Sequence, residues 1–194
     1  MVELIPESYV NSLDPDRIFD RSAPLHVDLG CGDGSFLSLL AGQIPAHNFL
    51  GIERLVGRVR TAARKASQLS NVRVLRVETA YAVRYLLPPN SVHIFYLLFP
   101  DPWPKRRHHQ RRIVTLEFLD SIAAALTSDG RFCIATDQLD YFQEIERLAR
   151  ACHHLQPEPA KADTGFPRTT FEKRFVAAGA PIYRMELRKV SPVI

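Results

Sequence analysis

Five short apolar runs recur along the chain, each bounded by polar, glycine or proline residues. They lack the strict alternation of a strand with one solvated face, so we predict strands that are buried on both faces. The predicted strands span residues 25–30, 48–53, 72–77, 91–99 and 131–136.

Longer stretches with helical spacing of apolar residues separate these strands. The predicted helices span residues 35–43, 55–69, 111–126 and 138–152. Because alternating strands and helices form βαβ units, the sequence predicts an α/β fold, a doubly wound Rossmann-like sheet that is mostly parallel. With 194 residues we expect a single domain, in which a core at 25–155 follows an N-terminal extension at 1–24.

The pattern changes after residue 155. A proline-rich stretch at 156–168 predicts a loop. The runs "TTFEKRFV" (169–176) and "IYRMELRKV" (182–190) flank "AAGAP", and we predict that they pair as an antiparallel hairpin at one edge of the sheet. Residues 156–194 are therefore expected to form a loop and a C-terminal hairpin.

The sequence argues against two classes of protein, those that span a membrane and those that are secreted. No run approaches the roughly 18 apolar residues of a membrane span. The first 25 residues carry acidic and proline residues where a signal peptide needs a basic start and an apolar core. We therefore expect a cytoplasmic protein with no membrane partner. The three cysteines, Cys31, Cys133 and Cys152, are odd in number and widely spaced, which predicts reduced thiols.

The net charge of +4 is concentrated in one segment. Residues 105–112 hold five Lys and Arg residues, and removing these from the 25 basic residues leaves 20 against 21 acidic residues. Such a run is commonly just a solvated face. Because the whole positive excess lies beside a predicted ligand loop, we favour a polyanionic partner, most simply the phosphates of a nucleic acid.

An acidic residue stands at or just after the end of each predicted strand. In a doubly wound sheet, ligands bind outside the carboxyl ends of the strands, so these residues are expected to gather around one site. They are Asp28, Glu53, Glu78, Asp101 and Asp137.

The first strand runs into a glycine turn, "DLGCGDG". Gly30, Gly32 and Gly34 let the backbone pass close to a ligand before a helix begins. Asp28 and Asp33 would repel a pyrophosphate, whereas they suit S-adenosylmethionine, which carries an ammonium and a sulfonium. A structural turn is the alternative. Nineteen residues beyond the last glycine, Glu53 ends the next strand and favours the cofactor, because its carboxylate can accept from ribose hydroxyls.

The chain resembles the tRNA (guanine-N7-)-methyltransferases, a family of class I S-adenosylmethionine-dependent enzymes. The residues that carry the resemblance are "DLGCGDG", "GIE" ending at Glu53, "LLFPDPWPKRRHHQRR", "IATDQLDYF" and "TTFE", from about residue 25 onward. It implies methyl transfer to N7 of a tRNA guanosine in the variable loop, position 46. Glu78 and Thr79 stand where the family more often has Asp and Ala.

The resemblance also implies roles for individual residues. Cofactor-site positions are Asp28, Gly30, Gly32, Gly34, Glu53, Glu78, Thr79 and Asp101. Guanosine-site positions are Lys105, Asp137, Thr169, Thr170, Phe171 and Glu172. The positions expected to face the RNA are Arg107, His108, His109, Gln110, Arg111 and Arg112.

The chemistry of guanine N7 explains the predicted catalytic pair. N7 has an in-plane lone pair and no proton to lose, so attack on a sulfonium methyl needs positioning rather than a general base. Asp101, in a loop stiffened by prolines, and Asp137 could hold the guanine and stabilise its developing positive charge. No metal is expected, because Cys152 with its two neighbouring histidines has no second ligand cluster.

Simpler structural roles stay open for four of these features. Asp137 could be a helix N-cap. Glu78 could be an exposed glutamate rather than an adenine contact. Trp103 could stack on a base, but packing is favoured. Thr169–Glu172 could simply start a strand, with Glu172 paired to Lys173 or Arg174.

Two other functions remain open. One is an amino-methyltransferase, since "FPDPW" occupies the place where a proline-containing loop can grip an exocyclic amine. The other is a non-catalytic RNA-binding module. We expect tRNA as the partner of a monomer or homodimer, and no obligate protein partner is evident.

Overall fold

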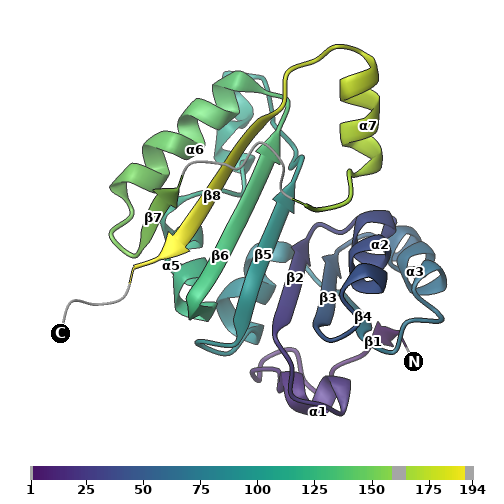
Figure 1. The fold of residues 1–194 in the computed structure, drawn as a ribbon. Coiled ribbons are helices and arrows are strands. Elements are labelled where there is room, and N and C mark those ends of the chain that lie inside the picture. The colour runs from purple at the N-terminus through teal and green to yellow at the C-terminus, as the bar shows by residue number, and fades with distance from the viewer. Residues whose placement is uncertain (1, 159–164, 191–194) are drawn as a thin grey trace.

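A mixed sheet of eight strands crosses the computed structural model, which describes residues 2–158 and 165–190 (Figure 1). The strand order is β1-β4-β3-β2-β5-β6-β8-β7, and neighbours among the first six pair in parallel. The predicted doubly wound α/β sheet is therefore confirmed. The strands are β1 (Glu3–Leu4), β2 (Leu25–Leu29), β3 (Asn48–Glu53), β4 (Val72–Arg76), β5 (Val92–Leu98), β6 (Leu126–Thr136), β7 (Leu155–Glu158) and β8 (Tyr183–Lys189).

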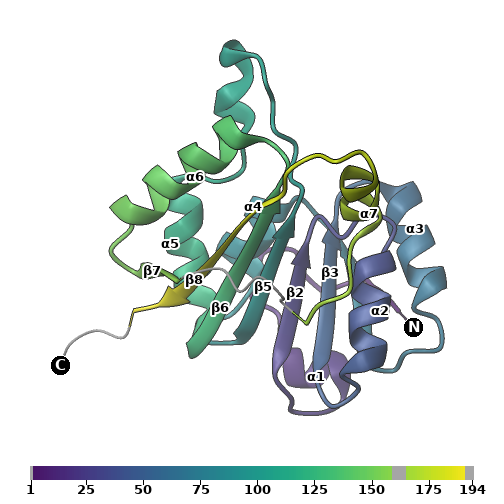
Figure 2. The same ribbon diagram turned by 45° about the horizontal axis from the view of Figure 1, so that its top comes forward.

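Helices cover both faces of the sheet (Figures 1 and 2). On one face lie α2 (Ser35–Gln43) and α3 (Val56–Lys65), and on the other lie α5 (Leu116–Ala125) and α6 (Leu139–Ala151). Alternate side chains of β5 enter different cores: Ile94 and Tyr96 pack on the α2 side, and Phe95 and Leu97 pack on the α5 side. This burial on two faces explains the continuous apolar runs of the strands.

Short helical segments complete the described chain. The N-terminal extension contributes both β1, at the sheet edge, and α1, whose Phe19 is buried in the core. None of the helices in the described ranges is both long and apolar enough to cross a membrane. The short segments are α1 (Pro15–Phe19), α4 (Thr79–Tyr81), the π-helical turn η1 (Ala82–Leu86), the 3-10 helix η2 (Arg106–Arg111) and α7 (Thr170–Ala177).

The predicted C-terminal hairpin is wrong in its first strand. Residues 170–177 form α7, and β8 instead pairs antiparallel with β6 and with β7. The Thr169 hydroxyl accepts a hydrogen bond from the Glu172 amide (3.0 Å), as in a helix-capping sequence Thr-x-x-Glu. The β-branched and aromatic residues of this run suggested a strand, and the capping signal outweighs them.

Two element boundaries differ from the prediction by five residues. The helix expected from residue 111 begins at Leu116, because Thr115 caps it, and Arg111 instead ends η2. Strand β6 begins at Leu126, five residues before the expected start at 131. The later start of the helix lengthens the segment that joins β5 to α5 and carries the basic run, whereas the earlier start of β6 places that strand directly after α5.

A close contact between α2 and α3 generates the first prediction. Gly34 has φ +73°, and a Cβ placed on it would lie 2.6 Å from the Cβ of Ala62. We expect Gly34→Ala to lower the free energy of unfolding by about 1–3 kcal/mol, because the left-handed backbone and the contact both resist a methyl group. Urea unfolding measures the change.

Gly57→Ala is the matched control. Gly57 lies in α3 with nothing within 4 Å of an added Cβ and no unusual φ, so alanine should leave stability unchanged or raise it slightly. Equal stabilities for the two variants would contradict the packing role of Gly34.

Candidate active site

A cleft of about 500 Å³ opens where β2, β5 and β6 end. Strand β2 lies between β3 and β5, so the chain turns to opposite sides of the sheet at this point, which is where doubly wound folds bind ligands. The lining residues are Asp28, Gly30, Cys31, Gly32, Asp33, Ser35, Phe36, Arg58, Leu98, Phe99, Pro100, Asp101, Pro102, Asp137, Thr169, Thr170, Phe171, Arg174 and Phe175.

The glycine turn forms one wall of the cleft. Gly30 and Gly32 have φ values of +77° and +56°, which other residues rarely adopt, and an added Cβ on Gly30 would meet nothing within 4 Å. The amides of Gly30 and Cys31 both donate to the carbonyl of Ile52 (2.8 and 3.0 Å), which ties the turn to the end of β3. The turn therefore presents open backbone to the cleft at Gly30 and Gly32, whereas Gly34 packs against Ala62 and does not line the cleft.

Two buried carboxyl groups lie behind this turn. Asp28 and Glu53 end adjacent strands and are 4% and 5% exposed. Burial, followed by the charge of Glu53, raises the pKa of Asp28 to about 7. Glu53 accepts from the Leu55 amide (2.9 Å) and lies 3.9 Å from Arg58. Asp28 lines the cleft and Glu53 does not, so Asp28 is the better placed of the two to meet a cationic ligand.

Glu78 and Thr79 are not brought to the cleft. The Glu78 carboxylate caps α4 by accepting from the amides of Ala80 (3.0 Å) and Tyr81 (2.7 Å). Glu78 lines a separate cavity of about 300 Å³, beside Arg84. Its role in the described chain is therefore a helix cap, which was not among the roles predicted for it.

Asp101 lies in a segment with unusual backbone geometry. Among the described residues, four other than glycine have positive φ, and two of them, Phe99 (+55°) and Trp103 (+45°), are bulky aromatic residues on either side of Asp101. The left-handed region is costly for such side chains, and its use is concentrated at functional sites. The ring of Phe99 also contacts Phe175 of α7 (centroids 5.4 Å apart). The prolines around Asp101 do not by themselves require a positive φ at Phe99 and Trp103, so tertiary contacts such as that of Phe99 with Phe175 help to fix this backbone.

Asp137 follows β6 and faces the same cleft. Its carboxylate accepts from the side chain of Gln138 (2.5 Å), and α6 begins with Gln138 as N-cap and no side-chain capping bond. The alternative role of Asp137 as a helix cap is therefore wrong. Asp101 and Asp137, from different strand ends, line one cavity, as the sequence predicted.

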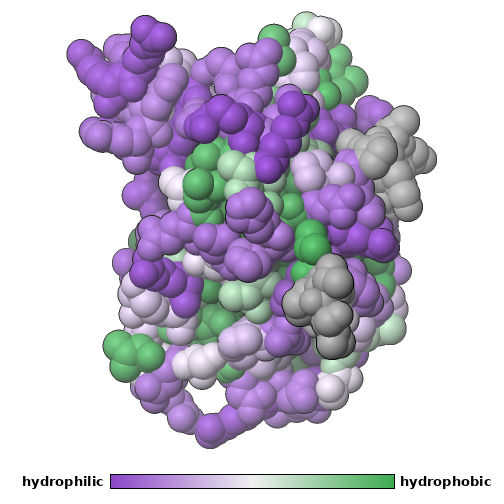
Figure 3. Space-filling view, turned by 90° about the vertical axis from the view of Figure 1, so that its left-hand side faces the viewer, coloured by the Kyte–Doolittle hydropathy of each residue, from purple (hydrophilic) through white to green (hydrophobic). Residues whose placement is uncertain are grey.

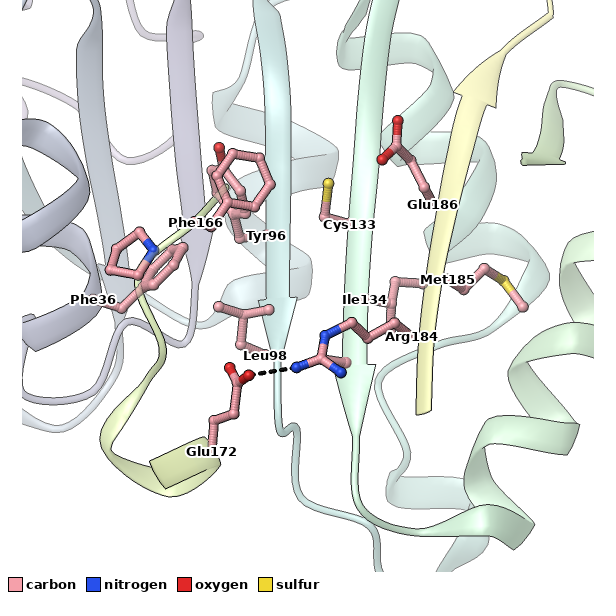
Figure 4. Close-up of a pocket in the computed structure, with 12 residues that line it drawn as sticks. Phe36, Tyr96, Leu98, Cys133, Ile134, Phe166, Glu172, Arg184, Met185 and Glu186 are labelled. Carbon is pink, nitrogen blue, oxygen red and sulfur yellow. Dashed lines mark hydrogen bonds and ion pairs between the residues drawn. The ribbon is translucent and has the colours of Figure 1, made fainter. Parts of the chain in front are cut away.

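The start of α7 forms another part of the cleft wall. Thr169, Thr170 and Phe171 line the cleft, and Phe171 is half exposed. Glu172 instead forms an ion pair with Arg184 of β8 and lines a smaller apolar pocket of about 50 Å³, as Figure 4 shows. The alternative pairing of Glu172 with Lys173 or Arg174 is wrong, because the helix turns its carboxylate toward Arg184 on the sheet.

The basic run projects from the molecule. The teal segment between β5 and α5, which holds η2, stands clear of the sheet at the top of Figure 2, and a hydrophilic lobe occupies the upper left of Figure 3. Trp103 packs inside this segment, with the Arg111 guanidinium 5.0 Å above its ring and His108 against its edge. Lys105, Arg106, Arg107, Gln110 and Arg111 are exposed.

Arg112 does not belong to this exposed set. Its side chain is 2% exposed and forms ion pairs with Asp140 (2.5 Å) and Glu144. The prediction that Arg112 faces the RNA is wrong, because these partners on α6 draw the side chain into the protein.

Comparisons with known proteins identify the family. A family model described as "Putative methyltransferase" matches residues 22–185. The tRNA (guanine-N(7)-)-methyltransferase of Halorhodospira halophila is 35% identical over 95% of this chain and 82% of its own length. The chain belongs to the tRNA (guanine-N(7)-)-methyltransferase family. The protein of that name from Thermotoga maritima is 34% identical over 97% of this chain, which spans only 61% of that relative.

A solved structure of an antibiotic-related methyltransferase has the same fold as this tRNA (guanine-N(7)-)-methyltransferase family member. Its TM-score is 0.61 over 91% of this chain and 94% of that chain, at 19% sequence identity. At that identity the likeness extends to the fold alone.

Several lining residues of this tRNA (guanine-N(7)-)-methyltransferase family member were not predicted. Arg58 follows Glu53 in the first turn of α3, and Phe175 and Arg174 follow from the helix that replaced the expected strand. Phe36 opens α2 after the glycine turn. A helical reading of 170–177 would have indicated Phe171, Arg174 and Phe175 as one face.

The raised pKa of Asp28 leads to the second prediction. Below pH 7 the free protein holds a proton on Asp28, and a cationic ligand favours the ionised form, so binding should release that proton. The affinity for S-adenosylmethionine should then rise with pH, approaching about tenfold per unit below pH 7, and level off above it. Calorimetry in two buffers of different ionisation enthalpy counts the protons.

Asp28→Asn should remove this proton release. Asp33→Asn is the control, because Asp33 also lines the cleft but is exposed and already paired with Lys65 (2.5 Å), so the proton release should persist in that variant. A wild-type affinity independent of pH between 5.5 and 7 would mean that Asp28 is already ionised in the free protein.

Proposed function

We propose that this chain transfers a methyl group from S-adenosylmethionine to N7 of guanine in tRNA, at the variable-loop guanosine, position 46. The observation that carries the proposal is the placement of Asp28 and the glycine turn on one wall of a single cleft, with Asp101 and Asp137 at the strand ends beside them. Membership of the tRNA (guanine-N(7)-)-methyltransferase family supports the same reaction. Modification of tRNA implies a cytoplasmic location.

The residues around the glycine turn fit the cofactor. Gly30 and Gly32 leave open backbone, and a buried carboxyl at Asp28 suits a ligand that carries an ammonium. Glu53, at the end of the adjacent strand, is the candidate for the ribose hydroxyls. When bound, S-adenosylmethionine supplies an electrophilic methyl group on a positively charged sulfur.

The two carboxylates beside the turn fit the guanine. Its N1 and N2 groups are donors, and Asp101 and Asp137 are acceptors when ionised. N7 has no proton to lose, so the site needs to orient the ring and stabilise its positive charge, not to remove a proton. Thr170 and Phe171 of α7 line the same cleft and offer a hydroxyl and an apolar surface.

The exposed basic segment fits the RNA backbone. It begins at Lys105, shortly after Asp101, and is free of acidic residues from Lys105 to Arg111. Phosphates that contact this segment would bring the neighbouring nucleotides to the mouth of the cleft.

The experiment that tests the function is incubation of the chain with labelled S-adenosylmethionine and tRNA that lacks 7-methylguanosine, followed by nucleoside analysis. Labelled 7-methylguanosine is the expected product. A nucleoside methylated on an exocyclic amine would instead favour an amino-methyltransferase, for which the Pro-flanked Asp101 is the supporting feature. tRNA binding with no methylation would favour a non-catalytic RNA-binding module.

The third prediction concerns Asp137. We expect Asp137→Asn to reduce single-turnover methylation by about two orders of magnitude, because the amide places a donor against the guanine donors and removes a charged acceptor. The melting temperature should stay close to wild type, since Asp137 caps no helix. Asp129→Asn, an exposed carboxylate on β6, the strand that precedes Asp137, is the control. A fully active Asp137→Asn enzyme would place the guanine elsewhere.

The fourth prediction concerns the exposed basic segment. Replacing Arg107 and Arg111 by Gln should weaken tRNA binding and reduce the slope of log affinity against log salt by roughly 0.7 to 0.9 for each lost phosphate contact. Affinity for the cofactor should not change. Arg147→Gln with Arg150→Gln on α6 removes the same charge from another exposed surface and serves as the control. An unaltered slope would mean that the segment is only a solvated face.

A further inference from the structure

The last arginine of the basic run has a different environment from the others. Arg111 and Arg112 are adjacent in sequence, yet Arg111 is exposed on the face of Trp103 whereas the Arg112 side chain is 2% exposed. A buried guanidinium needs partners for its charge and its donors. The partners of Arg112 lie directly after Asp101 and in the helix that follows Asp137.

One edge of the Arg112 guanidinium holds the loop of Asp101. Its Nε donates to the carbonyl of Pro102, the residue directly after Asp101, at 2.8 Å. Prolines at 100, 102 and 104 have no N–H, so this stretch cannot be held by a regular backbone ladder. A side-chain donor that reaches the Pro102 carbonyl therefore substitutes for backbone hydrogen bonds.

The other edge holds the helix that follows Asp137. The terminal nitrogens of Arg112 donate to Asp140 (2.5 Å) and to Glu144, which lie one turn apart at the start of α6. Burial works against the charge of Arg112, but the hydrogen bonds to these two carboxylates outweigh it and raise the pKa of Arg112. The same contact lowers the pKa of Asp140, so both groups are charged.

An aromatic residue adds a second connection between the loop and α6. The Arg112 guanidinium lies 4.6 Å from the centre of the Tyr141 ring, and the Tyr141 hydroxyl accepts from the amide of Val114 (3.3 Å). The segment is thus fastened to α6 at residues 112 and 114, while its exposed part projects beyond this attachment.

We propose that Arg112 is a positioning residue that sets Asp101 relative to Asp137, and this rests on the proposed function. A single guanidinium joins the peptide after Asp101 to the helix after Asp137. The left-handed backbone at Phe99 and Trp103 persists only if surrounding contacts hold it, and the bond to Pro102 acts between those two residues. Because a reactive geometry tolerates displacements of well under an ångström, release of this contact should reduce the rate of the chemical step.

The test compares Arg112→Gln and Arg112→Lys with wild type in single-turnover methylation, at saturating tRNA and S-adenosylmethionine and well below the melting temperature. Arg112→Gln should lower the rate at least about tenfold. The Kd for tRNA and its salt slope should remain at the wild-type values. Arg112→Lys should recover part of the rate, since an ammonium can pair with one carboxylate but does not reproduce the fork that also reaches Pro102.

Two further variants calibrate the result. Arg150→Gln removes an exposed ion pair with Glu146 on the same helix and should have no effect on the rate. Arg111→Gln should weaken tRNA binding and lower the salt slope, in contrast to Arg112→Gln.

Should Arg112→Gln fail to fold, Glu144→Gln and Asp140→Asn each remove one carboxylate partner of the same guanidinium. Each should lower the rate without changing the salt slope.

Either of two results would overturn the inference. A wild-type rate in Arg112→Gln would mean that the contact does not govern the cleft, and a salt slope lowered by roughly 0.7 to 0.9 would make Arg112 a phosphate ligand instead. Failure of the proposed function is separate, because it would appear as a wild-type chain that forms no 7-methylguanosine in the same assay.

Discussion

Parallel pairing of β2 with β3 on one side and β5 on the other is the constraint on which the rest of the structure depends. The register sets Asp28 beside both Gly51 and Tyr96. A side chain at Gly51 would lie 2.6 Å from Leu37 and 2.8 Å from Cys31, so its absence allows α2 and the glycine turn to pack directly on β3. The strand ends, and with them the polar residues that follow, then share one edge of the sheet.

The chain uses arginine in two physically different ways within eight residues. The exposed arginines of η2 keep their charge in water, where it can attract phosphates over distances of the order of a Debye length. Arg112 loses water and gains two carboxylates, which gives it directional contacts rather than long-range attraction. The exposed arginines and Arg112 therefore lie in the same segment as Asp101, between β5 and α5.

Charge is also arranged unevenly around the cleft. Asp28 and Glu53 are buried together behind the glycine turn, and the free protein tolerates this by holding a proton on Asp28 near neutral pH. Asp101 is exposed and Asp137 is half-buried. Two carboxylates that remain accessible to solvent can meet the donors of a base, whereas the buried one is suited to a cation that replaces its proton. The different burial of the strand-end acids thus supports different roles for them.

Much of this arrangement follows from local sequence. Apolar runs too continuous for a half-exposed strand indicated the parallel sheet, and the strand-end positions of Asp28, Asp101 and Asp137 predicted that they would meet, because the topology of such a sheet brings these ends together. The glycine spacing predicted the open turn, since a positive φ depends mainly on the residue type at that one position and glycine adopts it readily. The helix at 170–177 is also encoded locally, in Thr169 and Glu172, although its β-branched and aromatic residues favour a strand.

Only the tertiary structure decided the environment of each charge. Arg112 is indistinguishable from its basic neighbours in sequence, and its burial depends on Asp140 and Glu144, which lie 28 and 32 residues away. Glu172 turns to Arg184 on a strand that was expected to pair differently. Periodicity reports how a segment folds on itself, whereas the burial of a charge depends on which distant partner the fold brings within hydrogen-bonding distance.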